Sequence, residues 1–289
     1  MLPRSFLLTP VTCQRSFDAA STSAADVIML DLVERDPQTD RSEIRALLPE
    51  RIRHLTALGR NVLVRINGGA LAPLDMRAAA VPGVCCVILP KVENPARLAE
   101  LHALLAVAEE SNGLPRGSVR TTVVIDQPHA VLDAREIACS STRIMALGFG
   151  AAELSAAMGV RPLLESFAMP AQMVALAARG AGLQCVGAIG SLPEAATPSG
   201  LLSLATKMKS MGFSGAVIGD PAQIETVNAV FSPEVEDLER AQEMVIAFES
   251  RGRIRAPVLA AVGGVVERPA YWQARAALGP LGEKPCDIP

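Results

Sequence analysis

The sequence is poor in aromatic residues and has no long uninterrupted apolar run. Aromatic residues make up 3% of its 289 residues, although hydrophobic residues make up 50%. A core of this composition must be built from Ala, Val, Leu and Ile, which suits close packing of strands against helices, and disorder is not expected. Arg, Glu or Pro interrupts each apolar stretch before it could span a bilayer, and the first residues lack the apolar core of a signal peptide. We therefore expect a cytoplasmic protein without membrane contacts.

The sequence also lacks a cluster of basic residues and a CxxC motif, which bears on the partners and the metal sites that can be expected. The formal net charge is −3 and no block of Lys and Arg occurs, so we do not expect a nucleic-acid partner. No CxxC motif occurs among the six cysteines, and Cys85 and Cys86 stand inside an apolar run. Buried reduced thiols are therefore expected rather than disulfides or a zinc site.

Short apolar runs alternate with helix-like segments along the chain. Each run is nearly continuous rather than alternating with polar residues, which is typical of parallel strands covered on both faces. Segments such as 94–110 and 233–252 carry apolar residues at helical spacing and charges on the other face. The candidate strands cover residues 5–9, 26–32, 61–66, 84–90, 121–126, 143–149, 184–189 and 215–219.

Eight strands alternating with helices predict a TIM (β/α)8 barrel. A doubly wound open sheet is the alternative, but no G-x-G-x-x-G follows the first strand. We expect the barrel to cover residues 1–252. Residues 253–289, which contain Gly263-Gly264 and several prolines, exceed what a barrel needs and are expected to form a C-terminal extension.

Two acidic residues follow neighbouring strands of the predicted barrel. Asp126 ends the fifth strand, and Glu153 follows the sixth, within LGFGAAELS. Active sites of such barrels lie at this end of the strands, and neighbouring strands are only about 4.8 Å apart, so the two carboxylates can share one ion. Two carboxylates with waters and substrate oxygens commonly hold Mg²⁺. If only one of the two acids were present, a helix cap would be the simpler interpretation. The presence of both acids beside Arg65 favours a metal site.

Arg65 interrupts the otherwise apolar strand NVLVRI. An unpaired charge there would be costly, so we expect an anion or a carboxylate partner. Two roles of Arg65 are open: a structural ion pair with an acid such as Glu34, and a contact with the ligand. Both can hold if the acid orients the arginine toward the ligand. Glu93 is assigned in the same way to orienting Lys91.

Eight segments of the chain together carry a family pattern. They are PRSFLLTP, ADVIMLDLVE, VLVRINGG, VILPKVEN, VVIDQPHAVLDAREIA, LGFGAAELSAAMG, SGAVIGDPAQIETVNAVFSP and GGVVERP. In this order they resemble the citrate lyase β-subunit-like family of the HpcH/HpaI aldolase/citrate lyase superfamily, which includes malyl-CoA and citramalyl-CoA lyases. The resemblance extends from about Pro3 to Arg275.

The resemblance implies a TIM barrel that binds Mg²⁺ and splits a 3-hydroxyacyl thioester, of CoA or an acyl carrier, into a 2-oxo acid and an acyl thioester. It implies that Asp126 and Glu153 are the metal ligands and that Arg65 stabilises the enolate oxygen. Glu267 would act as acid or base in a neighbouring subunit. The extension would then pack on that subunit, in a homotrimer or a homohexamer. Further substrate contacts are expected from Asn67, Gly68, Arg15 and Lys91.

The chain also departs from the family pattern. Asp126 stands where the family has Glu and Glu153 where it has Asp, so the pair keeps its charge and its combined side-chain length. Ala19 replaces a basic residue that contacts phosphate, which argues for a thioester hydrolase or a CoA-independent 2-oxo-acid aldolase on the same barrel. Asp220 could replace a catalytic group of the family or cap the helix that begins at Pro221, and we favour the cap. An inactive family scaffold is the other alternative, suggested by Ala152, Val33, Ala216 and Asp220 and opposed by the retained acids.

Overall fold

The computed structural model describes residues 2–33, 40–190, 192–233 and 235–249, and near the C-terminus residues 258–259, 265–266, 271 and 274–275. The chain divides into two compact units, one of residues Pro3–Phe231 and one of Ser232–Pro289 together with Met1–Leu2. The sequence suggested that the barrel would extend to residue 252. The division instead falls after Phe231, so the predicted helix 233–252 belongs to the second unit. Packing of the extension on a neighbouring subunit stays a prediction.

Eight parallel strands close into a barrel in the order of the sequence, which confirms the predicted TIM (β/α)8 fold. The last strand pairs with the first through the register of Phe6 opposite Val217. The fully buried pattern of β2 shows why these runs are continuously apolar, since helices cover one face and the barrel interior the other. The strands are β1 (Ser5–Pro10), β2 (Val27–Asp31), β3 (Val62–Arg65), β4 (Val84–Leu89), β5 (Arg120–Ile125), β6 (Ile144–Phe149), β7 (Gln184–Gly187) and β8 (Gly215–Ile218).

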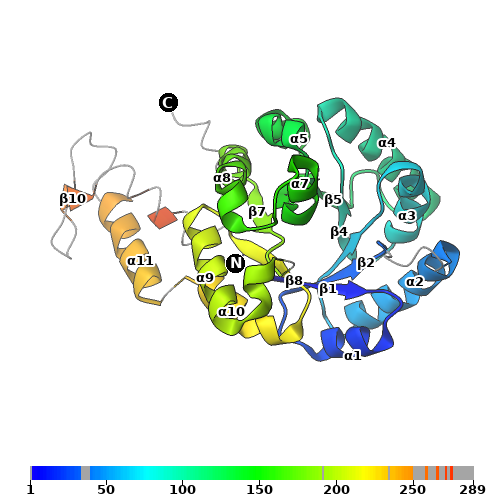
Figure 1. The fold of residues 1–289 in the computed structure, drawn as a ribbon, viewed down its shortest axis with the longest axis horizontal. Helices are drawn as coiled ribbons and strands as arrows, with labels where there is room; N and C mark the ends of the chain where they lie inside the picture. Colours follow the sequence, from blue (N-terminus) through cyan, green and yellow to red (C-terminus); the bar gives the residue numbers. More distant parts are fainter. Residues whose placement is uncertain are drawn as a thin grey trace. The chain divides into compact units, whose positions relative to one another are not determined.

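Helices surround the strands of the barrel (Figure 1). Asn94 caps α4, because its side chain accepts a hydrogen bond from the amide of Arg97 and Pro95 occupies the first turn. The helices of this unit are α1 (Gln14–Thr22), α2 (Arg41–Ala57), α3 (Ala72–Ala79), α4 (Pro95–Ser111), α5 (Pro128–Leu132), α6 (Ala134–Cys139), α7 (Ala151–Met158), α8 (Leu164–Gly180), α9 (Pro198–Ser210) and α10 (Ile224–Phe231), with 3₁₀ turns η1 (Gly69–Leu71), η2 (Pro193–Ala196) and η3 (Pro221–Gln223).

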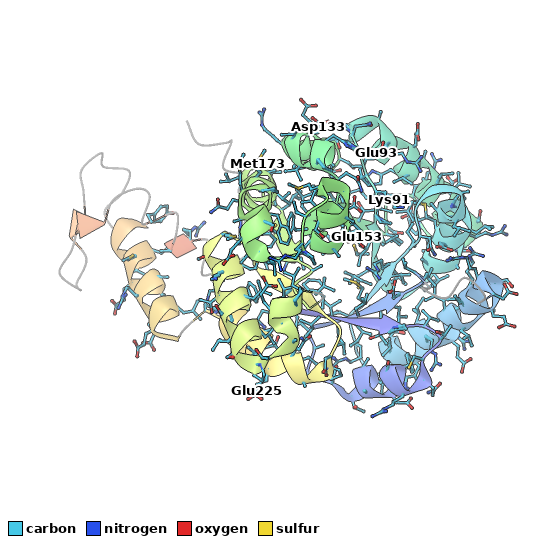
Figure 2. The ribbon with its side chains drawn as sticks, in the orientation of Figure 1. Lys91, Glu93, Asp133, Glu153, Met173 and Glu225 are labelled. Carbon is cyan, nitrogen blue, oxygen red and sulfur yellow. The ribbon has the colours of Figure 1, made fainter. Side chains whose placement is uncertain are left out.

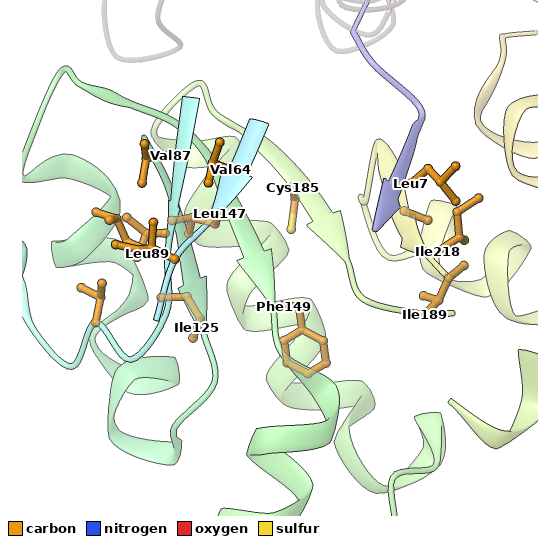
Figure 3. Close-up of a cluster of buried hydrophobic side chains, with 14 of the residues drawn as sticks. Leu7, Val64, Val87, Leu89, Ile125, Leu147, Phe149, Cys185, Ile189 and Ile218 are labelled. Atoms are coloured by element: carbon orange, nitrogen blue, oxygen red, sulfur yellow. The ribbon is translucent and has the colours of Figure 1, made fainter. Parts of the chain in front are cut away.

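Two layers of apolar side chains build the core of the barrel unit. The larger layer lies between strands and helices and includes Leu7, Val64 and Leu147 (Figure 3). The smaller layer, which includes Met29 and Ile88, lies in the barrel interior. Aliphatic side chains dominate both layers, as the shortage of aromatic residues requires.

The second unit contains α11 (Val235–Glu249) and an antiparallel pair of short strands, β9 (Val258–Leu259) and β10 (Val265–Val266). Ala241, Val245 and Ala274 form a small buried cluster in it. None of the described helices has the length and hydropathy needed to cross a bilayer.

The cysteines follow the expectation of buried thiols only in part. All five described cysteines are free: Cys86 and Cys185 are buried, as expected, whereas the expectation of burial was wrong for Cys13, Cys85 and Cys139, which are exposed. Cys13 precedes the first helical residue of α1, at the edge of a loop, and Cys85 lies near the start of β4, where the burial of that strand is interrupted.

Candidate active site

The carboxyl ends of the strands form one rim of the barrel, and a cavity opens there. Its volume is about 90 Å³, and Arg65, Asp126 and Glu153 are among its lining residues. Arg65 is the last residue of β3, Asp126 follows β5, and Glu153 lies in the first turn of α7. Figure 2 labels Glu153 on α7 and Lys91 in the loop between β4 and α4. The three residues that the sequence suggested for one site thus line the same cavity.

The carboxylate of Asp126 is buried, with 2% of the residue exposed. Its Oδ2 accepts a hydrogen bond of 3.2 Å from the backbone amide of Lys91. Its Oδ1 is buried without a hydrogen-bond partner among the residues that the structure describes. Burial raises the pKa of Asp126 to about 6; the negative charge of Glu153 adds to this, and the amide of Lys91 opposes it. One carboxylate oxygen is therefore available to a cation.

Gly150 allows the chain to pass close to Asp126. A Cβ atom at Gly150 would lie 2.8 Å from the Cβ of Asp126 and 3.1 Å from Cγ1 of Val124. The amide of Gly150 donates to the carbonyl of Ile125 at 3.0 Å, which ties the two strand ends together. The glycine in the stretch GFGAAE is thus required by the approach of β6 to the acidic residue of β5.

Arg65 is held by Asp31 in a two-pronged ion pair. Its Nε donates to Oδ1 at 2.8 Å and its Nη2 to Oδ2 at 2.6 Å. Burial lowers the pKa of Arg65, but the hydrogen bonds and charge of Asp31, with the charge of Glu153, outweigh burial and leave the pKa raised. Nη1 has no hydrogen-bond partner in the described part of the chain. Two of the three guanidinium nitrogens are used to fix the group, and the third is free for a ligand.

The partner of Arg65 was not identified from the sequence. From the sequence, the orienting role was assigned to Glu34, which lies outside the described residues. The signal was present, because Asp31 ends β2 opposite Arg65 at the end of β3 in the register of the sheet. Matching the last residues of adjacent strands would have found the pair.

The donor set at this site fits a hard divalent cation. Nowhere in the described part of the chain do three His, Cys, Asp or Glu side chains gather closely enough to enclose a metal. Asp126 and Glu153 supply two carboxylates, one with an unsatisfied buried oxygen. Mg²⁺ is commonly bound by one or two carboxylates while keeping water or substrate oxygens in its other positions. A thiolate or imidazole site for zinc does not match these donors.

Lys91 and Glu93 lie in the loop after β4. Lys91 has a φ of 54°, an uncommon left-handed conformation for a non-glycine residue. Both side chains are exposed, and no ion pair joins them in the described structure. The stem of Lys91 lies against Gly68, since a Cβ atom at that glycine would be 3.4 Å from Cδ of Lys91. Substrate contacts by Gly68 and Lys91, and the orienting role of Glu93, stay predictions.

Asn67 is tied into a structural network. Its side-chain amide donates to the carbonyl of Leu32 at 3.0 Å and to Asp75 at 2.8 Å, and its carbonyl oxygen accepts from Arg41 at 3.2 Å. The backbone amide of Asn67 also donates to Asp75, at 2.8 Å. This network fixes the turn after β3, and the predicted contact of Asn67 with the substrate would have to compete with it.

Arg15 lines a second cavity of about 440 Å³, together with Ala19 and Asp220. The side chain of Asp220 accepts from the amide of Ala222 at 2.9 Å, which confirms its predicted role as a cap. The role of Arg15 in substrate binding stays a prediction. Glu267, the predicted acid of the neighbouring subunit, lies outside the described residues.

Eight parallel strands closed into a barrel, with two carboxylates and an arginine lining a cavity at the rim, place the protein in the class of TIM (β/α)8 barrels. Comparison then assigns the family. A model of the HpcH/HpaI aldolase/citrate lyase family matches residues 4–221, and the chain belongs to this family.

Curated relatives and solved structures match the chain over most of its length. The citrate lyase subunit beta of Leuconostoc mesenteroides subsp. cremoris is 26% identical over 95% of this chain and 91% of its own. A (3S)-malyl-CoA thioesterase of Cereibacter sphaeroides is 30% identical over 95% of this chain and 93% of its own. A citrate lyase structure from Burkholderia xenovorans LB400 has a TM-score of 0.78 at 19% identity, covering 96% of this chain and 91% of its own. The CitE protein of Mycobacterium tuberculosis, crystallised with magnesium, acetoacetate and coenzyme A, has a TM-score of 0.69 at 24% identity, covering 97% and 98%.

Proposed function

We propose that this chain is a Mg²⁺-dependent carbon–carbon lyase. It cleaves a 3-hydroxyacyl thioester, of the citramalyl-CoA, malyl-CoA or citryl type, into a 2-oxo acid and an acyl thioester. The observation that carries the proposal is one cavity lined by two carboxylates and by the arginine that Asp31 holds. Membership of the HpcH/HpaI aldolase/citrate lyase family supports the reaction class, and the names of the relatives support a substrate that carries carboxylates.

Asp126 and Glu153 are the residues that would hold Mg²⁺. When bound, the ion would act as a Lewis acid toward the hydroxyl and carboxylate oxygens of the substrate. Asp126 presents Oδ1 for this purpose while the amide of Lys91 fixes Oδ2. Glu153, which is exposed in the first turn of α7 after β6, adds the second carboxylate.

Arg65 stabilises the charge that develops on the thioester half. The hydroxyl of the substrate gives up its proton to solvent as its C–O bond becomes the carbonyl of the 2-oxo acid. At the same time the bond between the hydroxyl-bearing carbon and the α-carbon of the thioester breaks, and its electron pair moves onto the thioester oxygen as an enolate. Nη1 of Arg65 is the free donor for that oxygen, and the ion pair with Asp31 removes the need to reorganise the guanidinium during the reaction. Glu267 of a neighbouring copy would deliver the proton to the enolate carbon.

The test is the formation of a 2-oxo acid from a defined thioester. The full-length protein is incubated with citramalyl-CoA or malyl-CoA, with Mg²⁺ or with excess EDTA, and pyruvate or glyoxylate is detected as a hydrazone. We expect product only with Mg²⁺, and loss of activity by at least about a hundredfold in Arg65→Lys, because lysine cannot reproduce the fork that Asp31 holds. Failure of the wild type to release an oxo acid from either thioester would refute the proposal.

A thioester hydrolase is the second candidate, favoured by the relative named (3S)-malyl-CoA thioesterase at 30% identity. The same assay separates the two reactions, because hydrolysis releases the free thiol of CoA together with the intact hydroxy acid. Thiol release without oxo acid would identify the hydrolase. An aldolase without CoA would instead cleave a free hydroxy acid, and a scaffold would show no difference in function between the wild type and Asp126→Asn.

A further inference from the structure

The cavity at the rim continues into the barrel as an apolar space. Inward-facing residues of a barrel strand recur at every second position. The residue two positions before each rim residue therefore also faces the interior, one layer deeper in the barrel. That layer consists of Leu63, Ile88, Val124, Gly148 and Val186, which all line the cavity. The rim is polar where Arg65 and Asp126 lie, and the layer inward of it is apolar.

Gly148 leaves this layer open on the side of β6. The other four positions carry branched side chains, and Gly148, which pairs with Val124 in the sheet, carries none. A Cβ atom at Gly148 would lie 3.4 Å from Cγ2 of Val124 and 3.8 Å from Cγ2 of Thr122, both ordinary contacts. The backbone of Gly148 is not in the left-handed region either. Neither crowding nor backbone conformation requires this glycine, in contrast to Gly150, so its effect is to provide space.

The whole cavity, rim included, is large enough for part of a ligand. Its volume of about 90 Å³ is several times the roughly 10–15 Å³ that one water needs by the same measure. Thr122 is a polar residue of the wall, and its hydroxyl is already 3.4 Å from the Sγ of Cys86. Water in the inner part would therefore find few hydrogen-bond partners, and an apolar group would be preferred there.

We propose that this inner space, the Gly148 cavity lined by Leu63, Ile88, Val124, Gly148 and Val186, receives an alkyl substituent on the reacting half of the substrate. Gly148 then determines which alkyl length the site accepts. The inference rests on the proposed function, because the polar head of the substrate must be bound at Asp126 and Arg65 for its alkyl group to reach inward. The substituent belongs either to the 2-oxo acid or to the acyl thioester.

The test compares alkyl lengths in the wild type and in Gly148→Val. Dissociation constants of glyoxylate, pyruvate and 2-oxobutyrate are measured in the presence of Mg²⁺, followed by those of acetyl-CoA, propionyl-CoA and butyryl-CoA. Gly148→Ala is the milder variant, whose added methyl group meets only ordinary contacts. Gly180→Ala, at the end of α8 with nothing within 4 Å of an added Cβ atom, is the control.

In the wild type we expect affinity to rise about fourfold per added methylene group in one of the two series. Gly148→Val should weaken the longest member of that series by about tenfold or more and leave the shortest unchanged, with Gly148→Ala intermediate. Equal affinity for all lengths in both series, or an equal loss for all lengths in both Gly148 variants, would overturn the inference alone. Absence of Mg²⁺-dependent binding for every compound would overturn the proposed function and the inference with it.

Discussion

At the scale of single residues, the carboxyl group of Asp126 is the feature on which the site depends. It is buried, one oxygen is fixed by a backbone amide, and the other has no partner among the described residues. Such a group destabilises a metal-free protein when it is ionised and becomes useful when a cation is bound. The arrangement is typical of a functional site, where part of the stability of the fold is given up for binding.

Asp126→Asn should stabilise the metal-free protein at pH 8. The pKa of Asp126 is raised to about 6 by burial, so its contribution to stability is present below about pH 4 and is lost as the pH rises through 6. The ionised carboxylate costs up to about 3 kcal/mol at pH 8, and the neutral amide avoids this cost. Thermal unfolding in EDTA at pH 8 should give a higher Tm for the variant, and at pH 4 the two proteins should differ little. A lower Tm of the variant at pH 8 would contradict this account.

The residue scale also shows what the sequence could and could not predict about the site. Asp126, Glu153 and Arg65 were predictable because each interrupts or ends an apolar run at the same end of a strand. Asp31 was missed as the partner of Arg65, because only the register of β2 and β3 places the two residues opposite each other. The Gly148 cavity could not be predicted from any single residue. It results from which side chains face the barrel interior and from the sizes of all of them.

At the scale of elements, the eight predicted strands and the two predicted helical segments, 94–110 and 233–252, followed the sequence closely. Each predicted strand differs from the observed one by a few residues at most, because parallel strands buried on both faces are continuous apolar runs with sharp ends. The two short helices α5 and α6 in the connection after β5 were not distinguished from the sequence, since helices of five and six residues carry too few apolar positions for a clear helical period. The site requires two unusual backbone features: the left-handed conformation of Lys91 after β4 and the close approach at Gly150 after β6.

Gly150→Ala should damage the metal site through the contact between β6 and β5. The added methyl group would lie 2.8 Å from Cβ of Asp126, so either the carboxylate or the start of α7 must shift. We expect Mg²⁺ affinity to fall by at least about tenfold and stability by about 1–3 kcal/mol. Calorimetry and denaturant unfolding measure both. Gly180→Ala is the matched control, and Mg²⁺ affinity within twofold of the wild type in Gly150→Ala would show that the close approach does not matter.

Lys91 should contribute to the metal site through its backbone. Its amide donates to Asp126 while its backbone has a φ of 54°, and glycine adopts this conformation without the roughly 1 kcal/mol strain of other residues. Lys91→Gly is therefore expected to keep Mg²⁺ affinity, whereas Lys91→Val, with a β-branched side chain unsuited to this region, should weaken it severalfold. If calorimetry finds the order reversed, the side chain and not the backbone of Lys91 supports the site.

At the scale of the whole molecule, the barrel was predictable and its boundary was not. The helical pattern of 233–252 resembles that of a barrel helix, so the sequence suggested a unit ending at 252. In the structure α11 forms a cluster with Ala274 and Tyr271 and belongs with the C-terminal segment. Amphipathic spacing predicts that a helix has a buried face, but not which part of the chain covers that face.

The predicted role of Glu267 in a neighbouring subunit can be tested by complementation. Asp126→Asn and Glu267→Gln should each be inactive, because one loses the metal and the other the proton donor. If the acid acts between subunits of a trimer or hexamer, co-expression of the two variants should restore about a quarter of the wild-type sites. Mass by light scattering verifies that mixed oligomers form. Mixed oligomers without recovered activity would place Glu267 in its own subunit or outside the reaction.

The central claim is that Asp126 and Glu153 hold one Mg²⁺ ion for a carboxylated substrate, and calorimetry tests it most directly. Mg²⁺ is titrated into the full-length wild type and Asp126→Asn at pH 8, each with and without pyruvate or oxaloacetate. The account predicts one site per chain in the wild type, tighter binding with the oxo acid because its oxygens complete the coordination, and no binding in Asp126→Asn. Equal binding to the wild type and the variant, or none to either, would contradict it.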